Sequence, residues 1–170
     1  MIPPEVLAWK DLAQKYADLN PPVTVAELLT FMTLESSGVQ FAVNASDPSW
    51  GLYQLTFPIA KAYGGLSEPP ARLETPGTPP SWGYDTTSQV FDPDFNMGTA
   101  AKFIAHLKKT WGTEYQDSWM IGYNEGETNL GKGRPDPEYL AAFTSRLAQL
   151  NELLDAPDNS NDAMDEDLGT

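Results

Sequence analysis

The sequence predicts a mainly α fold with a small loop or hairpin lobe. Apolar residues recur at three- and four-residue spacing in residues 4–19, 24–36 and 137–154, which is typical of amphipathic helices. Stretches rich in glycine, proline, serine and aspartate separate them. The chain has 170 residues, no cysteine and no long apolar run. We therefore expect one domain without disulfides or a membrane span.

The first two predicted helices have clear boundaries. Helix 4–19 ends before Pro21 and Pro22, because proline removes a donor and restricts the residue before it. The next helix begins at Thr24, whose side chain and that of Glu27 are placed to form a capping box. Glycine 38 is suited to the left-handed stop at its end.

The middle of the chain alternates between loops and helices. Residues 42–57 carry polar and turn-forming residues, and we interpret them as a loop with one small hairpin. A short helix is predicted over 58–63. Residues 66–90 form a long proline-rich insert, and long irregular loops in compact domains are usually functional or disordered. A further helix is predicted from residue 93 to 111.

Two more helices and a tail complete the prediction. A helix is expected over 117–123, and another over 137–154 with Asp136 as its cap. The last segment contains six acidic residues from 155 onward and no basic one, a composition typical of solvated, disordered chain. We therefore divide the chain into a domain at 1–155 and an acidic tail at 156–170.

Charge and composition exclude several functions. The net charge of −14 is unfavourable for binding nucleic acid, whose phosphates require lysine and arginine. With one histidine, His106, and no cysteine, neither a transition-metal site nor another cofactor is expected. The N-terminus lacks a basic start followed by an apolar run, so we expect synthesis in the cytoplasm without a signal peptide.

Glu35 is the residue for which position predicts chemistry. It lies at the C-terminal end of helix 24–36, beside Phe31, Met32 and Leu34. Helix carbonyls and apolar surroundings both disfavour its charge and raise the carboxyl pKa. A carboxyl group that stays protonated near neutral pH can donate a proton to a leaving oxygen. From position alone, a solvated glutamate at a frayed helix end is the alternative.

Several short motifs occur in the order found in one enzyme family. They are Glu35-Ser36, Gly51-Leu52-Tyr53-Gln54, Phe91-Asp92-Pro93-Asp94-Phe95-Asn96 and Tyr123-Asn124-Glu125-Gly126. Together they resemble the soluble-type lytic transglycosylase catalytic domain, kin to goose-type lysozymes. Its usual motifs are E-S, G-L-M-Q, F-D-P-x-x-N and A-Y-N-A-G, and the resemblance covers about residues 24–145. Tyr53 and Glu125 depart from the usual methionine and alanine.

The resemblance implies a lysozyme-like fold that cleaves the β-1,4 bond between N-acetylmuramic acid and N-acetylglucosamine in peptidoglycan glycan strands. In this family one glutamate, here Glu35, acts as acid and then as base. The 6-hydroxyl of muramic acid attacks its own anomeric carbon and gives a 1,6-anhydro product. A two-carboxylate glycosidase needs a second carboxyl group. Asp47 and Glu125 are the nearest by motif position, and either would favour hydrolysis.

By motif match, the resemblance also implies a set of substrate-binding residues. They are Ser36, Tyr53, Gln54, Tyr123 and Asn124. Gln54 is expected to bond an N-acetyl group, and Tyr123 to orient the Glu35 carboxyl group. Tyr53 is expected to stack on a sugar, with Trp82 as a second stacking candidate. The alternatives are helix capping by Ser36, core packing by Tyr123 and packing within the insert by Trp82.

The expected substrate lies outside the cytoplasm, whereas no export signal is expected. The acidic charge is also unfavourable for free diffusion along an anionic wall. We therefore expect a phage-encoded enzyme that is associated with the virion and other virion proteins, and that acts on the cell wall. The alternatives are a hydrolysing, lysozyme-type endolysin, a secretion-system enzyme, and a non-catalytic structural virion protein that keeps the fold.

Overall fold

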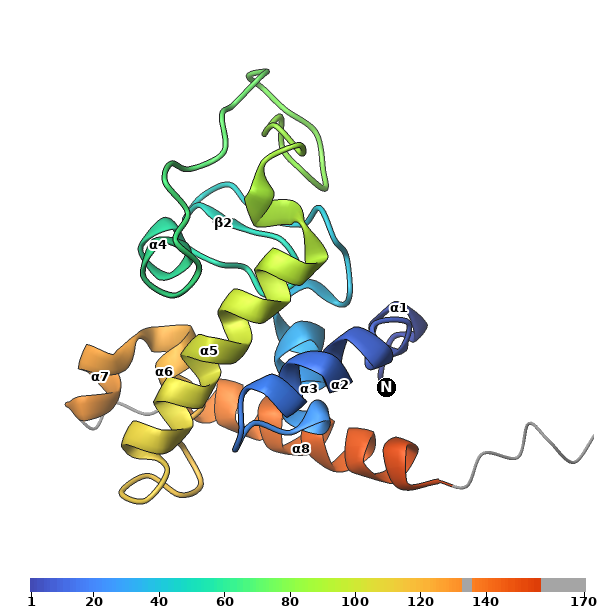
Figure 1. The fold of residues 1–170 in the computed structure, drawn as a ribbon, viewed down its shortest axis with the longest axis vertical. Helices are drawn as coiled ribbons and strands as arrows, with labels where there is room; N and C mark the ends of the chain where they lie inside the picture. The colour runs from blue at the N-terminus through green and yellow to red at the C-terminus, as the bar shows by residue number, and fades with distance from the viewer. Residues whose placement is uncertain (133–135, 157–170) are drawn as a thin grey trace, which may run out of the picture.

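The computed structural model describes residues 1–132 and 136–156, and it confirms the mainly α fold class (Figure 1). Its elements, in order, are α1 (Pro4–Leu7), α2 (Lys10–Leu19), α3 (Val25–Ser36), β1 (Val43–Asn44), β2 (Ser49–Trp50), α4 (Phe57–Gly64), the 3-10 helix η1 (Gln89–Phe91), α5 (Pro93–Trp111), α6 (Ile121–Glu125), α7 (Glu127–Gly131) and α8 (Pro137–Asp155). The predicted acidic tail lies outside the described residues from 157 onward.

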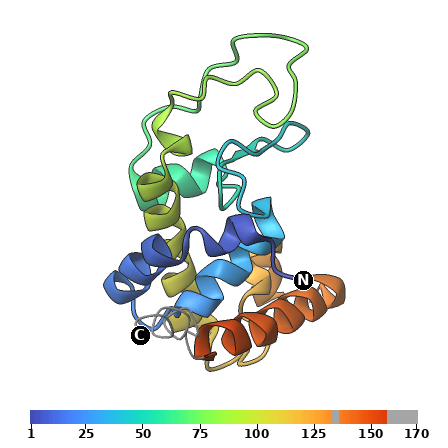
Figure 2. The ribbon, with the colours of Figure 1, turned by 90° about the vertical axis from the view of Figure 1, so that its right-hand side faces the viewer.

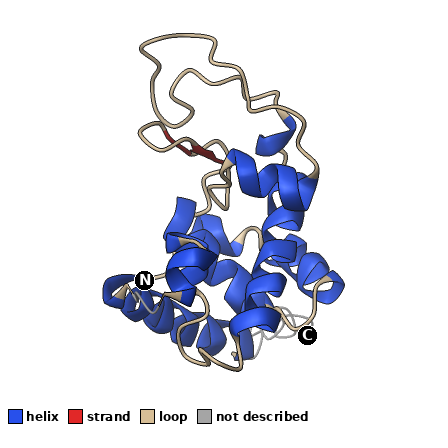
Figure 3. Ribbon diagram, turned by 90° about the vertical axis from the view of Figure 1, so that its left-hand side faces the viewer, coloured by secondary structure: helices blue, strands red, loops and turns tan. Residues whose placement is uncertain are grey.

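The helices form one lobe, and the hairpin, α4 and the proline-rich insert form a second (Figures 1 and 2). Helix α5 runs between the lobes and packs against α2 and α4. Strands β1 and β2 pair antiparallel as the small predicted hairpin, drawn in red in Figure 3. None of the described helices is both long and apolar enough to cross a membrane.

Helix α3 begins as predicted. The Thr24 hydroxyl accepts from Glu27 N at 3.1 Å, and Thr24 N donates to the Glu27 carboxylate at 2.9 Å. The left-handed stop starts one residue earlier than predicted, at Ser37 (φ 54°), and continues through Gly38 (φ 83°). A Cβ at Gly38 would lie 2.8 Å from the Glu5 carbonyl carbon, so this glycine also permits close packing of α1.

The structure corrects three predicted helix boundaries. The first helix is interrupted at Ala8 and Trp9, where the Trp9 indole donates to Gly38 O at 3.1 Å. The helix expected over 117–123 is replaced by turns followed by α6. The loop expected after it contains α7, because Gly126 (φ 85°) redirects the chain between two short helices. Local spacing missed these changes because tertiary contacts decide them.

The core of the helical lobe centres on Phe31 of α3. Its ring centroid lies 4.8 Å from that of Phe143 in α8, 4.9 Å from Tyr123 and 6.1 Å from Trp119. Phe143 and Leu150 are buried, so the apolar stripe of α8 packs against the core. This packing fixes the C-terminal end of α3 relative to α6 and α8.

Buried Asn96 of α5 joins the two lobes through its side-chain amide. Its Nδ2 donates to Trp50 O at 3.0 Å and to Val90 O at 2.8 Å, and its Oδ1 accepts from Tyr53 N at 2.8 Å. A Cβ at Gly51 (φ 82°) would lie 2.3 Å from Asn96 Nδ2. The Gly51 backbone can approach Asn96 only because glycine has no side chain.

We expect Asn96→Ala to lower the free energy of unfolding by about 2–5 kcal/mol. The substitution removes the described partners of two buried groups, Tyr53 N and Val90 O, and each unpaired group costs about 1–3 kcal/mol. Urea denaturation would measure the change. Gln149→Ala, which removes an amide from an exposed face of α8, is the control and should change stability by less than about 0.5 kcal/mol. Equal effects would contradict the proposed linking role.

Candidate active site

Glu35 lies in the last turn of α3, as predicted, and is half-buried. Burial raises its carboxyl pKa from the ordinary 4.5 to about 7, while a hydrogen bond from Tyr139 acts in the opposite direction. The rise in pKa predicted from the sequence is therefore confirmed. A carboxyl group with this pKa is largely protonated at mildly acidic pH and can exchange its proton near neutrality.

Tyr139 is the tyrosine that contacts the acid. Its hydroxyl donates to Glu35 Oε1 at 3.1 Å. It is brought there by the first turn of α8, where Asp136 caps the helix by accepting from Glu138 N and Tyr139 N, both at 3.0 Å. The sequence prediction missed Tyr139 because it lies 104 residues from Glu35 and no local pattern pairs them. Its only sequence signal is its position beside the predicted cap.

The expected bond from Tyr123 to Glu35 is wrong. The Tyr123 hydroxyl instead donates to the backbone carbonyl of Tyr53 at 2.6 Å. Its pKa is raised well above the ordinary value, by burial first and then by the nearby Glu35 charge. Tyr123 therefore lies close to the acid, but it ties α6 to the Gly51–Gln54 loop.

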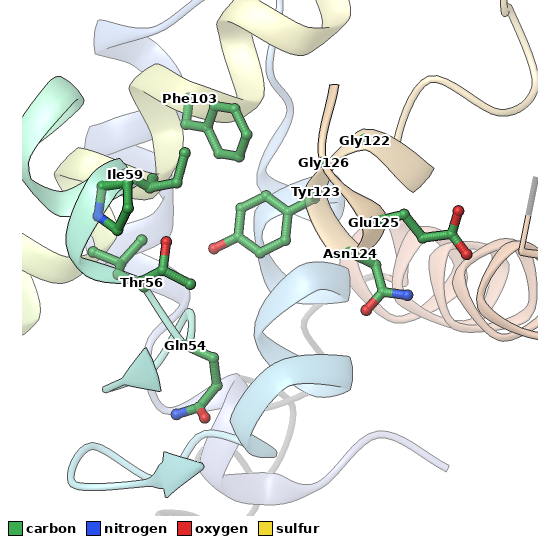
Figure 4. A pocket seen from close by; sticks show the side chains of 11 residues that line it. Gln54, Thr56, Ile59, Phe103, Gly122, Tyr123, Asn124, Glu125 and Gly126 are labelled. Atoms are coloured by element: carbon green, nitrogen blue, oxygen red, sulfur yellow. The ribbon is translucent and has the colours of Figure 1, made fainter. Parts of the chain in front are cut away.

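A pocket of about 320 Å³ lies beside Tyr123, between α4, α5 and α6 (Figure 4). It is lined by Gln54, Leu55, Thr56, Pro58, Ile59, Phe103, Gly122, Tyr123, Asn124, Glu125 and Gly126. In Figure 4 the Tyr123 ring lies between Phe103 and Thr56, with its hydroxyl directed to the Thr56 side. The pocket combines an apolar wall with a few polar groups, which is the usual character of a small-ligand site.

The amide of Gln54 is engaged with the protein. Its Nε2 donates to Ala42 O and Gly51 O, both at 2.9 Å, and its Oε1 accepts from the Ser49 hydroxyl at 3.1 Å. Gln54 lines the pocket, but its amide is directed towards the hairpin (Figure 4). The expected bond to an N-acetyl group stays a prediction, and the structure gives Gln54 a role in holding the loop.

The expected stacking of Tyr53 on a sugar is wrong. Its side chain is 0% exposed, and its hydroxyl donates to Leu28 O of α3 at 3.0 Å. The tyrosine that replaces the usual methionine thus anchors the motif loop to the helix that carries Glu35. Trp82, the second candidate, is 37% exposed and lies in the insert, away from the residues that line the Tyr123 pocket.

Ser36 and Asn124, two of the predicted substrate-binding residues, differ in their contacts. The Ser36 hydroxyl accepts from Gly38 N at 3.2 Å and donates to Met32 O at 3.4 Å, which is the helix-end alternative. Asn124 is exposed at the pocket, and its Nδ2 donates to Asp136 Oδ2 at 3.2 Å. Of the two, Asn124 is better placed to meet a ligand.

The two possible second carboxylates occupy different places. Asp47 lies in the hairpin turn and lines a neighbouring pocket rather than the one beside Tyr123. Glu125 lines the Tyr123 pocket, but in Figure 4 its carboxylate is directed away from the Tyr123 hydroxyl. His106 Nε2 lies 2.7 Å from the Glu127 carboxylate. Within residues 1–132 and 136–156, no three His, Cys, Asp or Glu side chains are grouped to hold a metal ion.

Comparisons with known proteins agree with this fold. Residues 12–138 match the family described as the transglycosylase SLT domain. A search of curated proteins finds no match. Among solved structures, an inactive mutant of the lytic transglycosylase Slt from Pseudomonas aeruginosa is similar, with a TM-score of 0.66 and 16% sequence identity. The similarity covers 89% of this chain and 25% of that one, so this chain corresponds to about a quarter of that protein.

Because the family match covers most of the chain, the protein belongs to the transglycosylase SLT domain family. The structural similarity confirms the lysozyme-like fold that the motifs implied. Within this fold the structure places the candidate acid, Glu35, at the end of α3, and Tyr139 against its carboxyl group.

We expect Tyr139→Phe to raise the pKa of Glu35 above its value of about 7. The hydrogen bond from Tyr139 stabilises the ionised carboxylate and lowers this pKa, so its removal leaves the opposing effect of burial. NMR titration of ¹³C-labelled glutamate carboxyl groups would follow the signal, assigned by its loss in Glu35→Gln.

Tyr123→Phe is the matched control for this titration. It also removes one tyrosine hydroxyl, but that hydroxyl donates to Tyr53 O and not to Glu35. The Glu35 pKa should therefore change less than in Tyr139→Phe. A larger rise in the Tyr123 variant would restore the role that the motif match gave to Tyr123.

Proposed function

We propose that the protein is a peptidoglycan lytic transglycosylase that cleaves the β-1,4 bond between N-acetylmuramic acid and N-acetylglucosamine. One observation carries this proposal: the Glu35 carboxyl group has a pKa of about 7 and a hydrogen bond from Tyr139, and its charge acts on Tyr123, which lines the Tyr123 pocket. Glu35 itself is not among the residues that line that pocket. Membership of the transglycosylase SLT domain family supports the same chemistry.

The proposed reaction needs one carboxyl group in two protonation states. Protonated Glu35 donates its proton to the glycosidic oxygen while the bond from that oxygen to C1 of muramic acid breaks. The resulting carboxylate then accepts the proton of the muramic 6-hydroxyl as O6 forms its bond to C1. The product is a 1,6-anhydro ring, no water is consumed, and Glu35 returns to its starting state.

Burial of Glu35 suits both steps. A surface carboxyl group with a pKa near 4 holds few protons at neutral pH, whereas a value of about 7 matches the operating range in which acid and base forms coexist. Tyr139 engages Oε1, which leaves Oε2 for proton transfer and limits rotation of the carboxyl group.

Transglycosylation is favoured over hydrolysis by the placement of the other carboxylates. An inverting or retaining hydrolase positions a second carboxyl group across the scissile bond. Here Asp47 lines a different pocket and Glu125 is directed away from the Tyr123 hydroxyl. Burial of Glu35 also disfavours a purely structural role, since a buried carboxyl group with a raised pKa weakens folding above neutral pH.

The product and the role of Glu35 are tested together by digesting purified peptidoglycan and analysing the muropeptides by mass spectrometry. We expect anhydromuramic ends from the wild type. Glu35→Gln keeps the shape but has no transferable proton, so turnover should fall on the order of 10²–10⁴-fold or more. Reducing muramic ends would show hydrolysis, and clearance by folded Glu35→Gln would exclude Glu35 as the acid.

Unfolding experiments on Glu35→Gln separate lost chemistry from lost structure. The folded pKa of Glu35 is raised, so the stability linked to its protonated form is fully present below about 4.5 and is lost as pH rises through about 7. Above pH 7 the glutamine variant should be at least as stable as the wild type, by up to about 3 kcal/mol. Glu152→Gln, which removes an exposed carboxyl group of α8, should not reproduce this gain.

We further propose a phage virion or ejection component that acts with other virion proteins on the periplasmic or extracellular wall. The support is electrostatic: a net charge of −14 opposes free diffusion along an anionic polymer, whereas a particle-bound enzyme is delivered without steering. The protein should then be retained on purified virions after washing in high salt, as judged by immunoblotting. Recovery in the soluble lysate alone would favour the endolysin alternative.

A further inference from the structure

A second pocket, of about 530 Å³, lies beside the first. Its lining residues come from the hairpin, the start of α4 and the proline-rich insert: Asp47, Pro48, Trp50, Thr56, Phe57, Pro58, Pro69, Pro70 and Tyr84. Thr56 and Pro58 line both pockets. The two pockets therefore adjoin at the N-terminus of α4.

The proline-rich insert, which contributes part of this pocket's lining, is held together by its own backbone hydrogen bonds. Its two arms pair with each other: Leu73 N donates to Gly83 O, and Asp85 N donates to Ala71 O, both at 2.7 Å. The Arg72 guanidinium lies 5.2 Å from the centroid of the Tyr84 ring. Figures 1 and 2 show this long loop above the hairpin and α4. The pairing holds the two arms of the insert together within the second lobe.

Tyr84 connects the insert to the hairpin. Its ring packs edge-on against Trp50 of β2, with centroids 5.8 Å apart and an interplanar angle of 74°. Among the described residues, Trp50 Nε1 is the one buried side-chain nitrogen or oxygen without a hydrogen-bond partner, and Trp50 is 3% exposed. An unpaired buried donor is unusual in native proteins. Because this nitrogen is closed to solvent, Trp50 contributes apolar surface to the pocket lining and no accessible donor.

The chemistry of the walls favours a sugar. Aromatic rings and proline rings offer flat apolar surfaces of the kind that pack against the C–H face of a sugar ring. Asp47 and Thr56 are polar residues of the lining, and carboxylate and hydroxyl groups suit sugar hydroxyl and amide groups. A polymeric glycan bound in the first pocket must also continue beyond it, and the second pocket adjoins the first at Thr56 and Pro58.

We propose that this second pocket is a distal subsite for an N-acetylated hexose of the same glycan strand, built by the insert at residues 66–90. The proposal rests on the proposed function for the identity of the strand. Tyr84 forms a wall of the subsite, and the insert extends the binding site beyond the first pocket. The protein therefore binds long glycan strands more tightly than short fragments.

The test measures binding without turnover. Full-length Glu35→Gln is titrated calorimetrically with β-1,4-linked N-acetylglucosamine hexamer and trimer. We expect the hexamer to bind more tightly, and Tyr84→Ala in this background to weaken hexamer binding about tenfold through loss of the ring contact. Tyr84→Phe keeps the ring and should retain the affinity. Tyr115→Ala, which removes a half-buried aromatic ring from the turn before α6, is the matched control.

A second readout reports on the pocket itself. The indole N–H signal of Trp50, assigned by its loss in Trp50→Phe, should shift in ¹H–¹⁵N spectra when the hexamer is added. No shift, or hexamer affinity unchanged by Tyr84→Ala, would overturn the subsite. A purified stem peptide that moves the Trp50 signal when the hexamer does not would also overturn it, in favour of a peptide site.

These outcomes are independent of the reaction. If the wild type produces anhydromuramic ends but Tyr84→Ala changes no oligosaccharide affinity, the subsite is wrong and the proposed function stands. If the Tyr84-dependent hexamer binding is found but no glycan is cleaved, the subsite stands and the proposed function is wrong.

Discussion

The site depends on one buried amide. Asn96 holds Trp50, Tyr53 and Val90 by their backbone groups, and these belong to the hairpin, the motif loop and the start of the segment that leads into α5. Because α5 also packs against α2 and α4, the amide fixes the hairpin lobe on the helical lobe. Gly51 is necessary for the same reason, since any Cβ there would meet the amide. The lining residues that come from positions 47–59 lie within a few positions of the Trp50 and Tyr53 contacts.

Hydrogen bonds connect the Gly51–Gln54 loop to the helices around the candidate site. The Tyr53 hydroxyl reaches α3 through Leu28 O, and its carbonyl accepts from Tyr123 of α6. Gln54 closes the loop onto Ala42 and Gly51. These motif residues therefore set the distance between α3, which carries Glu35, and the pocket wall. These hydrogen bonds give the motif residues a positional role, and Gln54 and Tyr123 also line the Tyr123 pocket.

The packing of α3 in this fold accounts for the raised pKa of Glu35. A carboxyl group at the end of a helix, half-buried among aromatic rings, is unfavourable for folding once it ionises. The packing of α3 on α8 holds it there and brings Tyr139 to its carboxyl oxygen. The result is a pKa of about 7, which a solvated helix-end glutamate does not reach. Under the proposed mechanism, this loss of stability accompanies a group that serves as both acid and base, a common trade-off at functional sites.

The sequence by itself determined the features that depend on neighbouring residues. The capping box of Thr24 and Glu27, the position of Glu35 at a helix end, the small hairpin and the Asp136 cap of α8 follow from residues close together in the chain. Only the tertiary structure decided that Tyr139, and not Tyr123, bonds Glu35, that Tyr53 is buried, and that the insert pairs with itself to form a second pocket. Those contacts join residues far apart in the chain, from 25 positions for Tyr53 and Leu28 to 104 for Glu35 and Tyr139. No local periodicity or motif encodes such distances, because they are set by how whole helices pack.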